Sequence, residues 1–220
     1  SSTFAPVATL KSIYDYCLSL APFKELIVST RPDCLSSETI DLLVSYKTRG
    51  YDVWIELGLQ SAHNSTLERI RRGHSVEDFT RTFAVLREAG LLIAVHVIFG
   101  LPGEGEKEIM ETIGYVREKK PDGIKIHNLH IPFHTPLYKE YCLGEISIPS
   151  SERHLEYTIQ ALERLPSQTV IMRLLCDTPK SHLAVPRKFW SKSYFYQQVQ
   201  EEMRRRNTWQ GRLSSGGSMP

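Results

Sequence analysis

The stretch Ile93-Ala94-Val95-His96-Val97-Ile98-Phe99-Gly100-Leu101-Pro102-Gly103-Glu104 decides the fold of this chain. Its apolar run, residues 91–99, has the length of one strand and is rich in β-branched side chains, which predicts a parallel strand covered on both faces. Gly100, Pro102 and Gly103 then predict a tight turn, and Glu104 is placed at the head of the next helix, where its charge suits the helix dipole. In folds built from such units, ligands bind where the strands open into these turns.

Strands and helices alternate on both sides of this stretch. The expected strands are residues 26–29, 53–60, 91–99, 123–130 and 169–174, and apolar residues at helical spacing lie between them. Strands separated by helices predict a parallel sheet with right-handed crossovers. The fold class is therefore α/β, either a doubly wound sheet or part of a (β/α) TIM-like barrel. Polar residues after several strands favour the barrel, and we expect an open, curved sheet of about four or five parallel strands.

The charge balance of the chain indicates no particular partner. The sequence has 27 basic and 25 acidic residues and a net charge of +2. No apolar run approaches the length of a membrane span, and the first residues have no signal-peptide pattern. We therefore expect a soluble, cytoplasmic protein without a membrane partner.

Four cysteines, Cys17, Cys34, Cys142 and Cys176, lie far apart in the sequence. None of the short spacings that make a zinc or iron–sulfur site occurs among them. Each is expected to be a buried small residue in a reducing compartment.

Three histidines, His127, His130 and His134, lie on and after the expected fourth strand. Side chains alternate between the two faces of a strand, so those of His127 and His130 are expected to point to opposite faces. This expectation argues against a three-histidine metal site. We predict no metal site in this chain and expect one of these histidines to line a substrate cavity.

Three motifs carry a resemblance to a known family. They are residues 55–61 (Ile-Glu-Leu-Gly-Leu-Gln-Ser), residues 71–74 (Arg-Arg-Gly-His) and residues 96–104 (His-Val-Ile-Phe-Gly-Leu-Pro-Gly-Glu). Together they resemble the adenosine-side motifs of radical S-adenosylmethionine (SAM) enzymes. This group includes the oxygen-independent coproporphyrinogen oxidases and the Elongator catalytic subunit.

A second set of segments narrows the resemblance to one subfamily. Residues 30–34, 58–63, 125–130 and 208–211 are similar to the YhcC-like bacterial proteins, whose substrate is unassigned. The resemblance extends over nearly the whole chain, residues 3–211, and is specific in aggregate.

The resemblance implies a SAM-binding pocket. SAM carries a carboxylate, an ammonium group, a ribose diol and an adenine, so its pocket requires an arginine, a carboxylate or amide, and close backbone approach. Arg72 can bind the carboxylate through two guanidinium nitrogens, a task that suits arginine better than lysine. Gln60, at the end of the preceding strand, would hold the same group or the ribose. The alternative for Arg72 is a solvated helix face, because it ends the basic run of residues 69–72.

Four further residues are assigned to the same cofactor site. Glu56 lies inside a strand, where an unpaired carboxylate is costly, so it requires a partner such as the cofactor ammonium or a buried base. Gly100 permits the backbone to approach the adenine. Glu104 is the last residue of the motif at residues 96–104. His96 is either a core histidine or a contact to the ribose.

The cluster cysteines of this family, in a Cys-x3-Cys-x2-Cys loop, have no counterpart in the sequence. We expect them upstream of Ser1, and interpret residues 1–177 as the later part of a partial barrel of the radical SAM type that lacks its first strands. Residues 178–213 are then a C-terminal extension and residues 214–220 a disordered tail. This chain alone is expected to be inactive without the cluster loop.

The resemblance also implies what the full-length parent does. It would bind a [4Fe–4S] cluster, receive an electron from flavodoxin or ferredoxin, and generate a 5′-deoxyadenosyl radical that takes hydrogen from a substrate. The substrate is unknown, and RNA is suggested by the Elongator relative.

Two other functions fit the same residues. The first is a non-catalytic nucleoside-binding module, and the second is a cofactor-free (β/α)-barrel hydrolase or lyase in which Glu56, His96 and Glu104 perform acid–base chemistry. Near the C-terminus, residues 204–206 and Trp209 combine basic charge with an aromatic ring. They indicate either a nucleic-acid contact or a helix end with cations at its negative pole.

Overall fold

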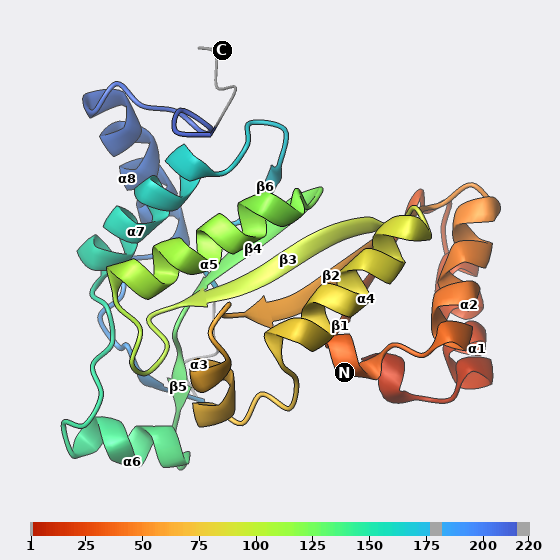
Figure 1. Ribbon diagram of the computed structural model, residues 1–220, viewed down its shortest axis with the longest axis horizontal. Coiled ribbons are helices and arrows are strands. Elements are labelled where there is room, and N and C mark those ends of the chain that lie inside the picture. Colours follow the sequence, from red (N-terminus) through yellow and green to blue (C-terminus); the bar gives the residue numbers. More distant parts are fainter. Residues whose placement is uncertain (1, 177–181, 215–220) are drawn as a thin grey trace.

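The protein folds around one parallel sheet, shown with its helices in the computed structural model of Figure 1. The structure describes residues 2–176 and 182–214. Five parallel strands form the sheet in the order β1-β2-β3-β4-β6. Their bounds are β1 Glu25–Thr30, β2 Asp52–Gln60, β3 Leu92–Phe99, β4 Gly123–Asn128 and β6 Val170–Arg173. A separate antiparallel pair is formed by β5 (Ile131–Pro132) and β7 (Leu183–Val185). The parallel sheet predicted from the sequence is confirmed.

Helices connect the strands of this sheet. The α-helices are α1 (Val7–Ser19), α2 (Ser37–Thr48), α3 (Asn64–Arg69), α4 (Val76–Glu88), α5 (Glu106–Lys119), α6 (Pro136–Cys142), α7 (Ser151–Arg164) and α8 (Lys192–Arg205). Two 3-10 turns, η1 (Ser2–Phe4) and η2 (Pro32–Cys34), complete the described elements. The longest helices have 14 residues, and none within the described ranges is a candidate membrane span.

One face of the sheet forms the hydrophobic core with the helices. Leu57, Val95 and Ile126 are fully buried on this face, and they belong to one apolar cluster with Phe79 of α4 and Ile113 of α5. Figure 1 shows α4 and α5 lying across the strands. Burial of each such side chain stabilises the fold by roughly 1.5–3 kcal/mol.

The opposite face of the sheet is polar near its centre. Glu56 of β2 contacts both His96 of β3 and Lys125 of β4 there. In β3, Ile98 on this face remains partly exposed whereas its neighbour Val97 is fully buried. The sequence predicted cover on both faces of the third strand. On this face Ala94 is fully buried, whereas His96 and Ile98 are partly buried.

Helix starts follow the predicted capping chemistry. The Ser36 hydroxyl accepts a hydrogen bond from the Thr39 amide, and Ser75 and Asp78 form a reciprocal capping box. The expectation for Glu104 is wrong by two residues, because α5 begins at Glu106 and its N-terminus is capped by the Glu108 side chain on the Gly105 amide.

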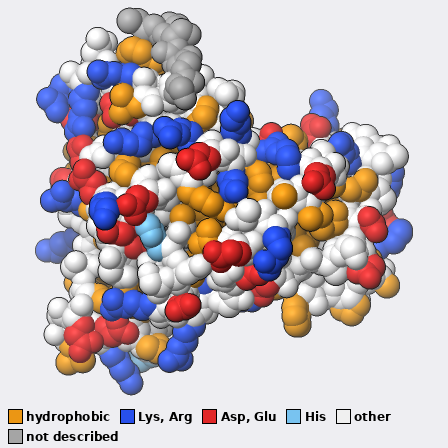
Figure 2. Space-filling model, viewed as in Figure 1, with side chains coloured by type: hydrophobic (Ala, Val, Ile, Leu, Met, Phe, Trp, Pro, Cys, Tyr) orange, Lys and Arg blue, Asp and Glu red, His pale blue; other side chains and the backbone are white. Residues whose placement is uncertain are grey.

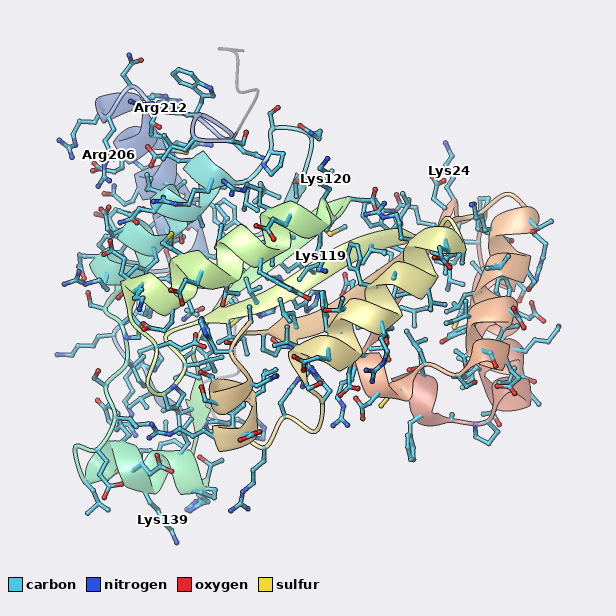
Figure 3. All side chains as sticks on the ribbon, in the orientation of Figure 1. Lys24, Lys119, Lys120, Lys139, Arg206 and Arg212 are labelled. Atoms are coloured by element: carbon cyan, nitrogen blue, oxygen red, sulfur yellow. The ribbon has the colours of Figure 1, made fainter. Side chains whose placement is uncertain are left out.

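The C-terminal helix α8 is fastened to α7 through paired charges. Arg206 donates to both carboxylate oxygens of Glu156, at 3.0 and 2.6 Å, and to Glu202. Arg206 and Arg212 lie at the carboxyl end of this helix (Figure 3). This arrangement agrees with the helix-end interpretation of the basic run. The predicted boundary at residues 177 and 178, and residues 215–220 of the tail predicted at residues 214–220, lie outside the described residues.

The helix-covered face of the molecule carries mixed charges. Figure 2 shows basic and acidic side chains interspersed over it, with apolar side chains between them. This face therefore presents no large field of one sign for a charged partner.

Candidate functional site

A cavity of about 460 Å³ opens at the carboxyl ends of β1 to β4, on the polar face of the sheet. We call it the rim pocket. Its lining residues are Arg31, Gln60, Ile70, Arg71, Arg72, His96, Ile98 and His127. Three of the six predicted site residues, Gln60, Arg72 and His96, therefore meet in one cavity.

Gln60 and Arg72 are brought together above Gly58. A Cβ atom added to Gly58 would lie 2.5 Å from Arg72 Nη2 and 2.5 Å from Gln60 Nε2, so the two side chains fill the space that a larger residue would need. Gln60 has φ of 73°, a left-handed conformation that is uncommon for a residue other than glycine. Such strain concentrates at functional sites.

Arg72 is not on a solvated helix face. Helix α3 ends at Arg69, and Arg72 lies in the following turn, partly buried. Its Nε donates a hydrogen bond of 3.1 Å to His74 Nε2. Burial lowers the pKa of Arg72, with the neighbouring Arg31 acting in the same direction. In the part of the chain that the structure describes, Arg72 makes no ion pair with a carboxylate.

Arg31, which lines the same pocket beside Arg72, differs in this respect. Its guanidinium binds Asp33 through two nitrogens, and the Nε bond measures 2.9 Å. This pairing raises the pKa of Arg31 and lowers that of Asp33. The charge of Arg31 is thus neutralised within the chain, whereas that of Arg72 is not.

Below the rim pocket lies a set of paired polar residues that we call the floor: Ser29, Glu56, His96 and Lys125. Glu56 is 6% exposed, accepts a hydrogen bond of 2.5 Å from the Ser29 hydroxyl, and forms an ion pair with Lys125. His96 Nε2 lies 3.3 Å from Glu56 Oε2 but lacks the geometry of a hydrogen bond. The proximity of His96, with Lys125 and Ser29, holds the pKa of Glu56 far below its usual value, so its carboxylate is charged.

His127 connects the floor to the rim pocket. Its ring stacks on His96 with centroids 5.2 Å apart, and burial lowers its pKa to about 3. The imidazole is therefore neutral at physiological pH. Its Nε2 is buried and has no hydrogen-bond partner among the described residues.

Gly100 and Glu104 lie apart from this arrangement, in a second cavity of about 400 Å³ that also includes Arg153 and Tyr157. Glu104 accepts a hydrogen bond from the Ser61 hydroxyl, and burial raises its pKa. A Cβ on Gly100 would collide with Pro149, and its φ is 87°, so packing alone already requires glycine there.

Sequence profiles of known families match most of the chain. The profile of the Radical SAM superfamily matches residues 7–116, and that of the Radical_SAM C-terminal domain matches residues 121–205. The chain belongs to the Radical SAM superfamily. The family expected from the sequence motifs is confirmed.

Three relatives illustrate where the chain stands within the Radical SAM superfamily. Protein YhcC of Escherichia coli (strain K12) is 40% identical over 189 residues, which cover 84% of this chain and 60% of YhcC. The tRNA uridine(34) acetyltransferase of Methanocaldococcus infernus is 32% identical over 158 residues, 70% of this chain and 29% of that protein. The structure of archaeal Methanocaldococcus infernus Elp3 with an N-terminal deletion is 26% identical and has a TM-score of 0.74, covering 84% of this chain and 43% of Elp3. The chain thus spans 60% of the length of YhcC.

Radical SAM enzymes use SAM and a [4Fe–4S] cluster. In this chain Cys17 lies on α1, Cys34 on η2, Cys142 on α6 and Cys176 after β6. Within residues 2–176 and 182–214, no group of three or more His, Cys, Asp or Glu side chains is arranged to hold a metal ion. The described residues therefore do not fit the cluster. The expectation that all four cysteines are buried is wrong, because Cys17 and Cys142 are exposed and the other two are partly exposed.

Sequence reasoning did not assign four residues of this site: Ser29, Arg31, His74 and Lys125. Lys125 had a usable signal, because it alternates with the buried residues of β4 and must therefore face the same side as His127. Ser29 and Arg31 belong to the end of another strand. The contact of Ser29 with Glu56 joins residues 27 apart in the sequence and depends on strand packing, whereas Arg31 pairs locally with Asp33.

Proposed function

We propose that this chain is the cofactor-binding portion of a radical SAM enzyme and that SAM binds in the rim pocket. The observation that carries the proposal is the guanidinium of Arg72. It is partly buried over Gly58 and has no carboxylate partner in the described residues. A desolvated charge without a partner is costly, and the carboxylate of SAM would supply one.

The residues of the rim pocket have separate tasks in this proposal. The Nη atoms of Arg72 take the carboxylate, and the amide of Gln60 holds the same group or the ribose. His96 lines the pocket from β3. Glu56 already has Lys125 as its partner, so we assign it to the floor instead of to the cofactor ammonium. A cavity of this volume lies within the range of ordinary small-molecule sites.

Gly100 and Glu104 support the site from the second cavity. Glu104 binds the hydroxyl of Ser61, the residue next to Gln60. We propose that this bond holds the strained backbone of Gln60 in place, while Gly100 lets the turn pack against Pro149.

Bound in the rim pocket, SAM would supply the chemistry of hydrogen-atom abstraction from the substrate, while Arg72 and Gln60 would hold its methionine end. We propose that this chemistry draws its electron from a donor such as flavodoxin or ferredoxin. The part of this chain is to hold the methionine end of SAM and to face the substrate with His127, whose neutral imidazole can donate or accept a hydrogen bond.

A calorimetric titration with SAM and with S-adenosylhomocysteine tests the cofactor assignment. Arg72→Ala should weaken binding by about 1.5–3 kcal/mol, the range for a hydrogen bond to a charged group. The matched control is Arg87→Ala, because Arg87 is paired with Asp122 near the other end of the sheet and should leave the affinity unchanged. Equal affinity in wild type and Arg72→Ala would contradict the proposal, and no binding by the wild type would favour a cofactor-free hydrolase or lyase.

We further propose RNA as the substrate class. The support is the similarity to a tRNA-modifying enzyme, together with Arg71, which lines the rim pocket and makes no ion pair among the described residues. Arginine beside a pocket suits a phosphate group. In a tRNA-binding assay over a salt series, Arg71→Ala should lower the affinity and reduce the salt slope by about 1. An unchanged slope would count against RNA.

A further inference from the structure

His74 is the only described hydrogen-bond partner of the Arg72 guanidinium. Its side chain is 8% exposed, and both ring nitrogens are engaged. Nε2 lies 3.1 Å from Arg72 Nε, and Nδ1 lies 3.2 Å from the carbonyl oxygen of Ser75. The roles in these two bonds determine the protonation of the ring.

The guanidinium can only donate, so His74 Nε2 must accept and carries no proton. The carbonyl of Ser75 can only accept, so the proton of the ring is on Nδ1. The surroundings therefore select one tautomer of a neutral imidazole. A second proton could enter only at Nε2, where it would face the N–H of Arg72.

The hydrogen bond to His74 also determines where the rest of the guanidinium lies. With Nε held by His74, Nη2 is positioned above Gly58, beside the amide of Gln60. Arg72 and Gln60 both line the rim pocket. A guanidinium released from His74 would lose this fixed orientation.

Charged groups from several elements surround His74. Arg72 and Arg31 disfavour its protonation, whereas Asp33 of η2 favours it, and Asp78 of α4 lies close enough to interact. Burial is the largest influence and, with Arg72, lowers the pKa of His74 from its usual value of 6.5. Glu68 of α3 lines the adjoining cavity of about 300 Å³.

We propose that His74 is a positioning residue that must be neutral for Arg72 to hold the cofactor carboxylate, so that protonation of His74 weakens cofactor binding. The inference rests on the proposed function, since it assumes that Arg72 binds SAM. Protonation replaces the acceptor at Nε2 by a donor and sets two cations against each other. Arg72 then turns away from Gly58, and the cofactor carboxylate loses its bidentate hydrogen bonds to the guanidinium.

The test is a titration with S-adenosylhomocysteine between pH 7.5 and 5, on the wild type and two variants of His74. The wild type should lose about tenfold in affinity as the pH falls below 6.5 through the lowered pKa of His74, the loss expected for one charge-assisted hydrogen bond. His74→Gln keeps an acceptor near Nε2 and does not titrate, so it should bind like the wild type at pH 7.5 and show a flat profile. His74→Ala should bind about tenfold more weakly at every pH.

Each outcome bears on a different statement. A profile for His74→Gln that falls as in the wild type, or wild-type affinity in His74→Ala, overturns the role of His74. If His74→Ala does not fold, the comparison of the wild type with His74→Gln decides alone. Arg72→Ala distinguishes the proposed function from the role of His74. If Arg72→Ala binds the ligand as the wild type does, the proposed function fails. If Arg72→Ala binds weakly and His74→Ala binds normally, only the positioning role of His74 fails.

Discussion

The floor and the rim of the site are marked on β2 by Glu56 and Gln60, four residues apart, yet their charged groups differ in pairing. At the floor, Glu56 is surrounded by Ser29, Lys125 and His96, so its charge is satisfied by the chain. At the rim, Arg72 is held by a neutral histidine and keeps its charge unpaired in the described structure. The floor therefore stabilises the sheet, whereas the rim has the unpaired cation on which the proposed binding of a carboxylate rests.

The largest effect is expected at the floor. Lys125→Ala leaves the buried carboxylate of Glu56 without its cation and should lower the free energy of unfolding by about 3–5 kcal/mol. Urea denaturation measures this change, with Lys139→Ala on the exposed side of α6 as the control that should stay within about 0.5 kcal/mol. The double variant Glu56→Gln/Lys125→Met should be more stable than Lys125→Ala, because no charge is left unpaired. A loss below about 1 kcal/mol in Lys125→Ala would show that the floor contributes little.

The second effect is expected at the rim and concerns binding more than stability. Gly58→Ala places a methyl group where Arg72 Nη2 and Gln60 Nε2 lie, so both side chains must move. SAM affinity should fall by about 1.5–3 kcal/mol, as it would after loss of the Arg72 contact. Gly114→Ala is the matched control, because nothing lies within 4 Å of its added Cβ in α5. It should raise stability by about 1 kcal/mol and leave SAM binding unchanged, whereas normal SAM binding by Gly58→Ala would separate Gly58 from the site.

A third effect concerns His127, between floor and rim. Its pKa is lowered to about 3 in the folded protein, while an unfolded histidine titrates near 6.5. Its contribution to stability is therefore complete above pH 6.5 and is lost as the pH falls toward 3, with a slope of about 1.4 kcal/mol per pH unit. Denaturation curves at pH 6, 5 and 4 should show a flatter pH dependence for His127→Gln than for the wild type. Identical slopes would mean that His127 is not held neutral.

The smallest effect is expected at the end of α8, where Arg205 and Arg206 are paired with carboxylates, as Lys125 is at the floor. Arg206 is bound by Glu156 and Glu202, so it has little charge to offer to a nucleic acid. Arg206→Ala should change tRNA affinity by less than about twofold, well below the effect of Arg71→Ala. A loss as large as that of Arg71→Ala would assign the helix to the binding surface.

The sequence predicted the fold well because the evidence for it is local. Hydrophobic periodicity located the five main strands within a few residues, and Ser36 and Ser75 marked the helix starts they cap. The meeting of Gln60 with Arg72 was also predictable, since Gln60 ends β2 and Arg72 follows the short helix α3 that comes next along the chain.

The environment of each charge could not be predicted in the same way. Glu56 was expected to need a partner, but the choice of Lys125 depends on the register of three neighbouring strands. The role of His74 depends on which ring nitrogen faces Arg72, and no sequence pattern encodes a tautomer. Glu104 was assigned to the cofactor by its place in a motif, whereas the structure turns it toward Ser61.

The all-parallel order of the main sheet has a consequence for how the chain folds. Every pairing in it joins segments separated by a helix, as when Glu25 pairs with Asp52 and Gly123 with Val170. Each strand pairing requires the closure of a long connection before it forms, which makes folding slow relative to a helical protein of the same size. During that time the unpaired apolar strands of one molecule can associate with those of another. The yield of refolded protein should therefore fall as the protein concentration rises.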